Sequence, residues 1–140
     1  MVDALKEIWR ILVPGGFLLD WRDVPVEWPL EIISGGQSRL AGYADTSSRI
    51  QKHRSADESL DLVKEEGLFG IEHQSSFSCA WYWDTLDEAK DNLKKTVPEE
   101  VWKKAKLLMA QNEEADQIRL RRVMRISVYR KRMVEGEPGR

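Results

Sequence analysis

The fold is decided by residues 4–19, which read ALKEIWRILVPGGFLL. One apolar stripe at helical spacing predicts a helix over residues 3–12; its members are Leu5, Ile8, Trp9 and Leu12. Pro14-Gly15-Gly16 ends this helix, because proline lacks a backbone N–H and glycine supports tight turns. The apolar run of residues 17–19 then predicts a strand buried on both faces, as in a parallel sheet flanked by helices. This order is the second half of a βαβ unit, whose first strand is missing from the chain.

Capping and alternation patterns predict the later elements. A helix over residues 55–66 begins at a capping box, Ser55 with Glu58, and Gly67 is placed for a left-handed cap. Two further capping boxes, at Thr85 and Thr96, predict two consecutive helices. Strands are predicted over residues 69–83 and 121–131. The first of these strands is expected to be half-buried, with one face formed by Phe69, Ile71, Phe77, Cys79, Trp81 and Trp83.

Residues 20–53 give the weakest signal in the chain. Pro25, Pro29 and three glycines interrupt any long element. We interpret the stretch as a long connection with a short helix over residues 39–43. Such connections are often functional loops or lids, and a poorly ordered excursion is the alternative.

Composition excludes several classes of protein. The 140 residues include 22 Lys and Arg against 24 Asp and Glu, a net charge of -2, which argues against a dedicated nucleic-acid domain. Cys79 is the single cysteine, so no intramolecular disulfide forms, and no Cys/His cluster offers metal ligands. No apolar run reaches the roughly 18 residues that cross a bilayer, and the charged N-terminus does not resemble a signal peptide. We therefore expect a cytoplasmic protein.

The order of these elements resembles part of the class I S-adenosylmethionine (SAM)-dependent methyltransferases, of the UbiE-like or type 11 kind. In that family a helix ending in Leu-x-Pro-Gly-Gly leads into the fifth strand of a seven-stranded sheet, as residues 4–19 do here. Residues 65–69, EEGLF, resemble the entry to the sixth strand. Residues 125–131, RISVYRK, resemble the seventh strand, which lies antiparallel between the fifth and the sixth. Two helices before the last strand also occur in small-molecule methyltransferases, where they help to cover the acceptor pocket.

The resemblance implies an α/β fold: a partial Rossmann-like methyltransferase fold with a small mixed sheet of strands equivalent to five, seven and six, and flanking helices. Residues 1–133 are expected to form a single domain equivalent to the C-terminal half of the family domain, with residues 134–140 as a flexible tail. The implied cofactor is SAM. The family's glycine-rich loop has no counterpart, since the sequence contains no Gly-x-Gly, and no cofactor-binding residue can be identified. We expect the chain to be inactive without the cofactor-binding half.

Six residues are candidates for a substrate pocket. Asp20 and Trp21, with Arg22, follow the first predicted strand at its carboxyl end, where open α/β sheets bind ligands. Trp28 suits either a lid over a ligand or a hydrophobic plug. Trp81, Trp83 and Trp102 would wall the acceptor side, which suits a flat or cationic acceptor, and core packing is the alternative. No catalytic residue can be assigned, and no metal site is expected.

The remaining polar residues favour structural interpretations. His73 is interpreted as a packed or edge histidine, His53 as solvated, and Cys79 as inward-facing and inert. An arginine-rich run between Arg119 and Arg132 is expected to be compensated by nearby acidic residues rather than to bind RNA.

An edge strand that is apolar on both faces invites another strand. We therefore expect a homo-oligomer, formed through that edge or the first helix, or pairing with a separate chain that carries the N-terminal half. The small-molecule acceptor would be the other partner, with no membrane and no nucleic acid. Two alternatives remain open: a non-enzymatic binding or oligomerisation module with methyltransferase-like architecture, and an RNA-binding accessory.

Overall fold

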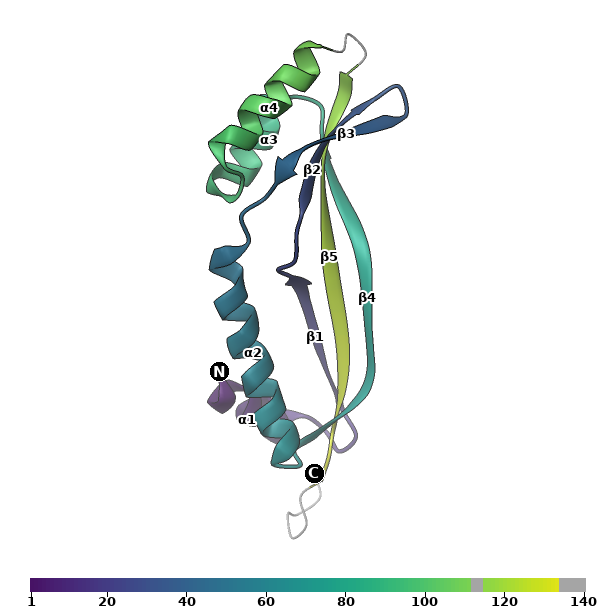
Figure 1. Ribbon diagram of the computed structural model, residues 1–140. Helices are drawn as coiled ribbons and strands as arrows, with labels where there is room; N and C mark the ends of the chain where they lie inside the picture. The colour runs from purple at the N-terminus through teal and green to yellow at the C-terminus, as the bar shows by residue number, and fades with distance from the viewer. Residues whose placement is uncertain (112–114, 134–140) are drawn as a thin grey trace. The chain divides into compact units, whose positions relative to one another are not determined.

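The described part of the chain forms four α-helices and a five-stranded antiparallel sheet. The computed structural model describes residues 1–111 and 115–133, so the predicted tail of residues 134–140 lies outside it. The elements run in the order α1 (Val2–Ile11), β1 (Phe17–Val24), β2 (Pro29–Ser34), β3 (Gln37–Tyr43), α2 (Ser47–Glu65), β4 (Phe69–Trp83), α3 (Leu86–Leu93), a short 3-10 turn η1 (Lys94–Thr96), α4 (Glu99–Ala110) and β5 (Ala115–Lys131) (Figure 1).

Strand β5 is the centre of the sheet. It pairs with β1, β2 and β4, and β3 pairs with β2. The three predicted strands are present in the predicted order, with β5 between β1 and β4. The predicted sheet was too small and its mixed character was wrong, because β2 and β3 add a hairpin and neighbouring strands run antiparallel.

The hairpin replaces the long connection and the short helix predicted for residues 20–53. Strand β1 continues to Val24, and β2 and β3 are joined by Gly35 and Gly36. These glycines have φ of 54° and 79°. Positive φ at both central residues is the mark of the type I′ turn, whose twist suits a two-residue hairpin. Gly35 and Gly36, which were expected to interrupt regular structure, therefore form the turn of the β2-β3 hairpin.

Backbone geometry confirms two of the predicted helix ends. Pro14 and Gly15 (φ 73°) occupy the centre of a turn that Gly16 N closes on Val13 O at 2.8 Å, which fits a type II turn. Gly67 has φ 79°, and its N–H donates to Lys64 O at 2.9 Å while that of Leu68 donates to Val63 O at 3.0 Å. These two bonds form a Schellman motif at the end of α2.

Two of the predicted helix starts were wrong. Helix α2 begins at Ser47, eight residues before the capping box expected at Ser55, and the Ser47 N–H donates to Asp45 Oδ1 at 3.0 Å. Helix α4 begins at Glu99 after Pro98, with no side-chain cap, so Thr96 does not cap it. At Thr85 the prediction is confirmed, because its hydroxyl accepts a hydrogen bond from Glu88 N at 3.2 Å.

The chain divides into two compact units, and each has its own core. The first unit contains residues 1–24, 49–77 and 124–133 of the described chain. Its core is formed by side chains of α1, α2, β4 and β5, namely Leu5, Leu60, Val63, Phe69 and Tyr129. Leu18 of β1 packs against this core, so the helices cover one face of this part of the sheet.

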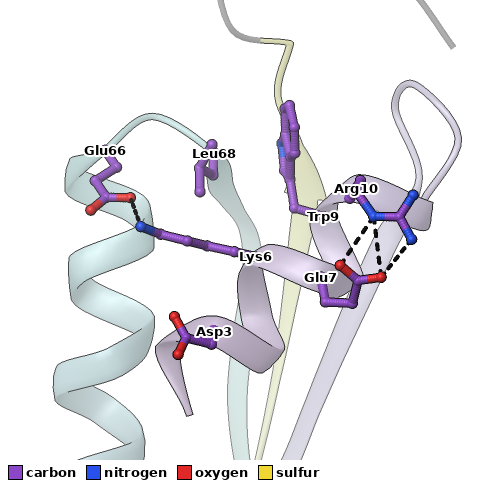
Figure 2. A pocket seen from close by; sticks show the side chains of 7 residues that line it. All are labelled: Asp3, Lys6, Glu7, Trp9, Arg10, Glu66 and Leu68. Atoms are coloured by element: carbon purple, nitrogen blue, oxygen red, sulfur yellow. Dashed lines mark hydrogen bonds and ion pairs between the residues drawn. The ribbon is translucent and has the colours of Figure 1, made fainter.

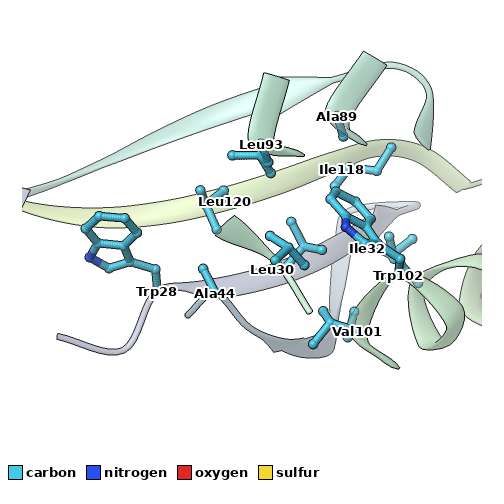
Figure 3. Close-up of a cluster of buried hydrophobic side chains, with 13 residues drawn as sticks. Trp28, Leu30, Ile32, Ala44, Ala89, Leu93, Val101, Trp102, Ile118 and Leu120 are labelled. Atoms are coloured by element: carbon cyan, nitrogen blue, oxygen red, sulfur yellow. The ribbon is translucent and has the colours of Figure 1, made fainter. Parts of the chain in front are cut away.

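The second unit contains residues 25–48 and 78–123, apart from the undescribed residues 112–114. Its core gathers side chains from β2, β5 and helices α3 and α4, with Trp28, Leu30, Ile118 and Leu120 all fully buried (Figure 3). The predicted inward face of α4 is confirmed, since Val101, Trp102 and Ala105 are buried and Leu108 and Met109 pack against the core.

Two predicted burial patterns were wrong. In β1, Phe17, Leu19 and Trp21 are 52%, 62% and 63% exposed, so the strand is covered on one face only. In β4, most residues after Gly70 are exposed, and the expected alternation breaks. Phe69 lies in the helix-covered core, whereas Phe77 contacts the exposed Trp21 with ring centroids 6.2 Å apart. Phe69 and Phe77 therefore do not share a face.

Candidate functional site

The alternation of β1 separates the first three candidate residues. Asp20 and Arg22 point to the same face as Leu18, which packs on the core, and Trp21 points to the exposed face. Asp20 and Arg22 form a bidentate pair, in which Arg22 Nε donates to Asp20 Oδ1 and Nη2 to Oδ2, both at 2.8 Å. Asp20 and Trp21 thus lie on opposite faces, although both were predicted to line one pocket.

Helix α2 brings two more polar side chains to this pair. His53 and Asp57 are four residues apart and share a helix face. Asp57 Oδ1 accepts from Arg22 Nη2 at 2.6 Å and from Arg125 Nη2 of β5 at 2.5 Å. Arg22 Nη1 also donates to the carbonyl oxygen of His53 at 3.0 Å. These five residues (Asp20, Arg22, His53, Asp57 and Arg125) form the charge cluster of the first unit.

The prediction that His53 is solvated was wrong. Its side chain is 16% exposed, with Nε2 3.4 Å from Asp57 Oδ2 and Nδ1 3.3 Å from Arg22 Nη1. Because a guanidinium only donates, the geometry requires Nδ1 to accept and leaves the proton on Nε2, facing Asp57. Both ring nitrogens of the neutral imidazole are thereby engaged.

Burial and neighbouring charges shift the pKa values of Asp57 and His53. Burial disfavours the ionised form of Asp57, but hydrogen bonds and attraction from Arg22 and Arg125 outweigh it and hold the pKa of Asp57 below its ordinary value. Burial is also the largest effect on His53, and it lowers the pKa of the imidazole. The positive charges of Arg22 and Arg125 lower this pKa further. Together they outweigh the opposite effect of Asp57 and Asp20, so the pKa of His53 lies below its ordinary value. Near neutral pH Asp57 is therefore ionised and the His53 imidazole is neutral.

This arrangement suits positioning better than proton transfer. The lone pair of the His53 ring faces a guanidinium, so it cannot take a proton from a ligand without first losing that contact. The cluster links β1, α2 and β5 through side chains that are mostly buried. Asp57 is its most exposed member, with 38% of its side chain open to solvent. Tyr129 lies beside it, and burial raises the pKa of its phenol.

The candidate tryptophans of the second unit take three different environments. Trp28 is fully buried and Trp102 is 3% exposed, so both belong to the core, and Trp83 packs against that core. Trp81 is 39% exposed. The Arg122 guanidinium lies between the rings of Trp28 and Trp81, 4.8 Å and 4.4 Å from their centroids. Of the two roles considered for Trp28, a lid over a ligand or a hydrophobic plug, its buried position fits the plug.

Four arginines of the run pair with carboxylates, but these carboxylates come from other elements than the prediction named. Buried Glu31 of β2 accepts from Arg119 at 3.2 Å and from Arg121 at 2.7 Å. Arg125 pairs with Asp57, and Arg130 with Glu72 at 2.7 Å. The nearby acidic residues expected to do this include residues 113, 114 and 116, whose side chains lie outside the described part of the chain.

Each unit also has an open pocket. In the first unit a pocket of about 560 Å³ lies between α1 and the end of α2 (Figure 2). Its lining is mostly charged, and Lys6 pairs with Glu66 at 3.4 Å across it while Arg10 pairs with Glu7. In the second unit a pocket of about 470 Å³ lies between β3 and α4 and includes Tyr43, Val101 and Lys104. None of the six candidate residues lines either pocket.

Sequence reasoning missed His53 and Arg125 as members of one site and saw Asp57 only as part of a cap. The available signal was the i, i+4 spacing of His53 and Asp57, which remained hidden because the helix was predicted to begin at residue 55. His73 is exposed on β4 and Cys79 is partly buried. Among the described residues no group of three or more acidic, histidine or cysteine side chains is arranged to hold a metal ion.

Within the described residues, no helix has both the length and the apolar character needed to span a membrane. Comparisons of the chain with protein-family models, with curated proteins and with solved structures found no match.

Proposed function

We propose that this chain supplies the acceptor-side portion of a class I SAM-dependent methyltransferase that acts on a small molecule. The observation that supports the proposal is the strand order β1-β5-β4, in which the last strand of the chain lies antiparallel between the two earlier ones. This is the arrangement of strands five, seven and six that the resemblance implies. A partial Rossmann-like architecture is thus part of the proposal.

The connections between the elements also support the proposal. Helix α1 enters β1 through the Pro14-Gly15 turn, and α2 connects β1 and the hairpin to β4 through the Gly67 cap. Helices α3 and α4 precede the last strand, as in the small-molecule members of the family. The pocket beside α4, at about 470 Å³, is within the size range of small-molecule sites.

The residues present do not fit SAM by themselves. A ribose needs an open carboxylate, but in the first unit Asp20 and Asp57 are already bonded to arginines. A cofactor's charged end needs a glycine-rich backbone cradle, and the sequence has no Gly-x-Gly. The cofactor site therefore belongs to another polypeptide segment, and the charge cluster would act by holding β1 in place for that segment.

Calorimetry and the surrounding gene sequence together test this function. We expect no heat of binding when SAM is titrated into the chain alone. We also expect a reading frame, in frame with or next to the codon for Met1, that encodes a strand followed by Gly-x-Gly-x-Gly. Produced together, the two segments should bind SAM with a stoichiometry of one per pair and transfer its methyl group to small acceptors.

Three outcomes contradict the proposal. The first is stoichiometric SAM binding by the chain alone, which would mean that it holds a cofactor site of another kind. The second is a joint protein that fails to bind SAM, and the third is a locus without a glycine-rich segment.

A non-enzymatic oligomerisation module is the second candidate function. The observation that favours it is the exposed aromatic and aliphatic face of β1, since large apolar side chains left open to solvent commonly mark an interaction surface. In this case the chain would associate with itself, and it would bind no SAM either alone or together with a glycine-rich segment.

A further inference from the structure

Strand β1 combines an open edge with an open apolar face. Among the described residues it pairs with β5 alone, so its second edge has no strand beside it. Its outward side chains are Phe17, Leu19 and Trp21, all more than half exposed. An edge of this kind is a template for another strand.

The other outer strand of this unit is protected in a way that β1 is not. Strand β4 carries a run of polar residues, from Glu72 to Ser76, along its length. Charged and polar side chains on an edge strand discourage further pairing. In β1 the outward face has an aromatic, an aliphatic and a second aromatic residue in succession, and its acidic residue Asp23 comes only near the end.

The free backbone groups of β1 belong to these same residues. The Lys131 N–H donates to Gly16 O at 2.8 Å, so the carbonyl that precedes Phe17 points toward β5 and the Phe17 N–H points away from it. In an antiparallel strand the direction alternates with each residue, and therefore Phe17, Leu19 and Trp21 direct their N–H and C=O groups to the open edge. The backbone groups that could hydrogen-bond to another strand therefore belong to the residues whose side chains are exposed.

The outward pattern of β1 is symmetric about Leu19. A two-fold axis needs a patch that complements itself, and aromatic–Leu–aromatic reads the same in both directions. We propose that the open edge of β1 binds β1 of a second copy of this chain, antiparallel, with the two-fold axis at Leu19. In this register Leu19 meets Leu19 of the second copy, and Phe17 meets Trp21 of that copy twice.

Neighbouring registers fit less well. Moving the axis to Asp20 places two carboxylates directly opposite each other, which destabilises a strand pair. Moving it to Trp21 places Leu19 opposite Asp23, whose carboxylate is engaged by Arg49 at 3.1 Å, and leaves Phe17 without a partner in the strand. Only the axis at Leu19 gives all three outward side chains an apolar neighbour.

This dimer does not rest on the proposed function. A cofactor-bearing segment that paired with the same edge would displace the second copy, and the dimer would then be the form that the chain takes without that segment. SAM binding and self-association are therefore separate readouts, and either can fail while the other holds.

Sedimentation of two matched leucine variants tests the interface. We expect the full chain to approach twice its mass of 16.2 kDa as its concentration rises. Leu19→Lys should lose this association, and Leu107→Lys should keep it. The two leucines are 62% and 60% exposed, so both changes place a charge on a comparably open position. A wild-type monomer at every concentration, or equal loss in both variants, overturns the proposal.

Cysteine crosslinking tests the register and does not depend on a lysine variant that folds. In a Cys79→Ser background treated with diamide, Leu19→Cys should form a dimer with itself, because opposed residues of a hydrogen-bonded pair lie about 5.5 Å apart at Cα, within disulfide reach. Phe17→Cys should crosslink only when mixed with Trp21→Cys. Crosslinking of Trp21→Cys with itself while Leu19→Cys stays monomeric would overturn the axis at Leu19.

Discussion

At the residue scale, Asp57 joins three side chains, because its one carboxylate contacts two arginines and a histidine. We expect Asp57→Asn to lower the free energy of unfolding by about 1–3 kcal/mol, since an amide cannot balance two guanidiniums and the carboxylate is partly screened by solvent. Urea denaturation measures this change.

A matched control for Asp57 lies one turn further along α2. Asp61 faces Lys64 at 3.9 Å, and its side chain is 67% exposed. Asp61→Asn should change stability by less than about 0.5 kcal/mol. Equal effects of the two substitutions would contradict the role given to Asp57.

The same residue sets the acid side of the stability curve. Because the pKa of Asp57 is lowered on folding, its contribution is present above the unfolded value of about 3.9 and is lost as the pH falls toward the folded pKa.

His53 gives a second pH dependence in a different range. Its folded pKa is lower than the unfolded value of about 6.5, so below that pH the unfolded chain binds more protons than the folded chain. We expect the free energy of unfolding to decrease as the pH falls from 7 to about 5.5, and His53→Gln to reduce that decrease. Unfolding curves at several pH values provide the measurement, and an identical slope in the variant would contradict this assignment.

Individual residues were predictable where local geometry decides their role. Gly67 ends a helix and Pro14-Gly15 forms a turn because of local backbone preferences, whatever the rest of the fold. Both are found as expected. The fate of Asp20, Trp21 and His53 depends on which face of β1 or α2 meets the core, and that depends on residues distant in sequence. The charge cluster was therefore not predictable from spacing alone.

At the element scale, two similar motifs have different outcomes. Thr85 and Thr96 each precede a Glu by three residues, but only Thr85 caps its helix, because Pro98 moves the start of α4 past Thr96. We expect Thr85→Ala to cost about 1 kcal/mol of stability and Thr96→Ala close to nothing. Thermal or urea unfolding of both variants measures the difference, and a larger loss at Thr96 would contradict it.

Element prediction succeeded where the pattern was long and failed where it was weak. Strand β4 has its predicted bounds because fifteen residues rich in aromatics favour a strand, although its faces were wrong. Its alternation breaks between Glu72, which pairs with Arg130, and Gln74, whose amide bonds the Ser127 hydroxyl at 3.0 Å. The first turns of α2 contain the polar residues 51–54, which lack an apolar stripe, so the start of the helix was placed too late.

At the scale of the whole molecule, the sheet could be predicted only in part. The order β1-β5-β4 followed from resemblance, because local patterns do not show which strands pair. The β2-β3 hairpin and its pairing with β5 were missed, since the pattern of two glycines between apolar runs was interpreted as a loop. The division into two units, each with its own core, likewise depends on long-range contacts.

Self-association also predicts a thermal property of the whole molecule. If the native chain dimerises and the unfolded chain does not, mass action raises Tm as the protein concentration increases. We expect this rise in the wild type and in Leu107→Lys, and a constant Tm in Leu19→Lys. Calorimetric scans over a range of concentrations provide the measurement, and a constant wild-type Tm would contradict the dimer.

The contrast between Trp21 and Trp28 gives the molecule a built-in optical reporter. The first ring is 63% exposed and the second is fully covered, although they are only seven positions apart. A collisional quencher such as acrylamide reaches the open indole and not the enclosed one, so Trp21→Phe should remove much of the quenchable emission. A second copy of the chain or a cofactor-bearing segment that binds β1 would shield the Trp21 indole. Binding at β1 would therefore be measurable as reduced quenching of tryptophan fluorescence by acrylamide.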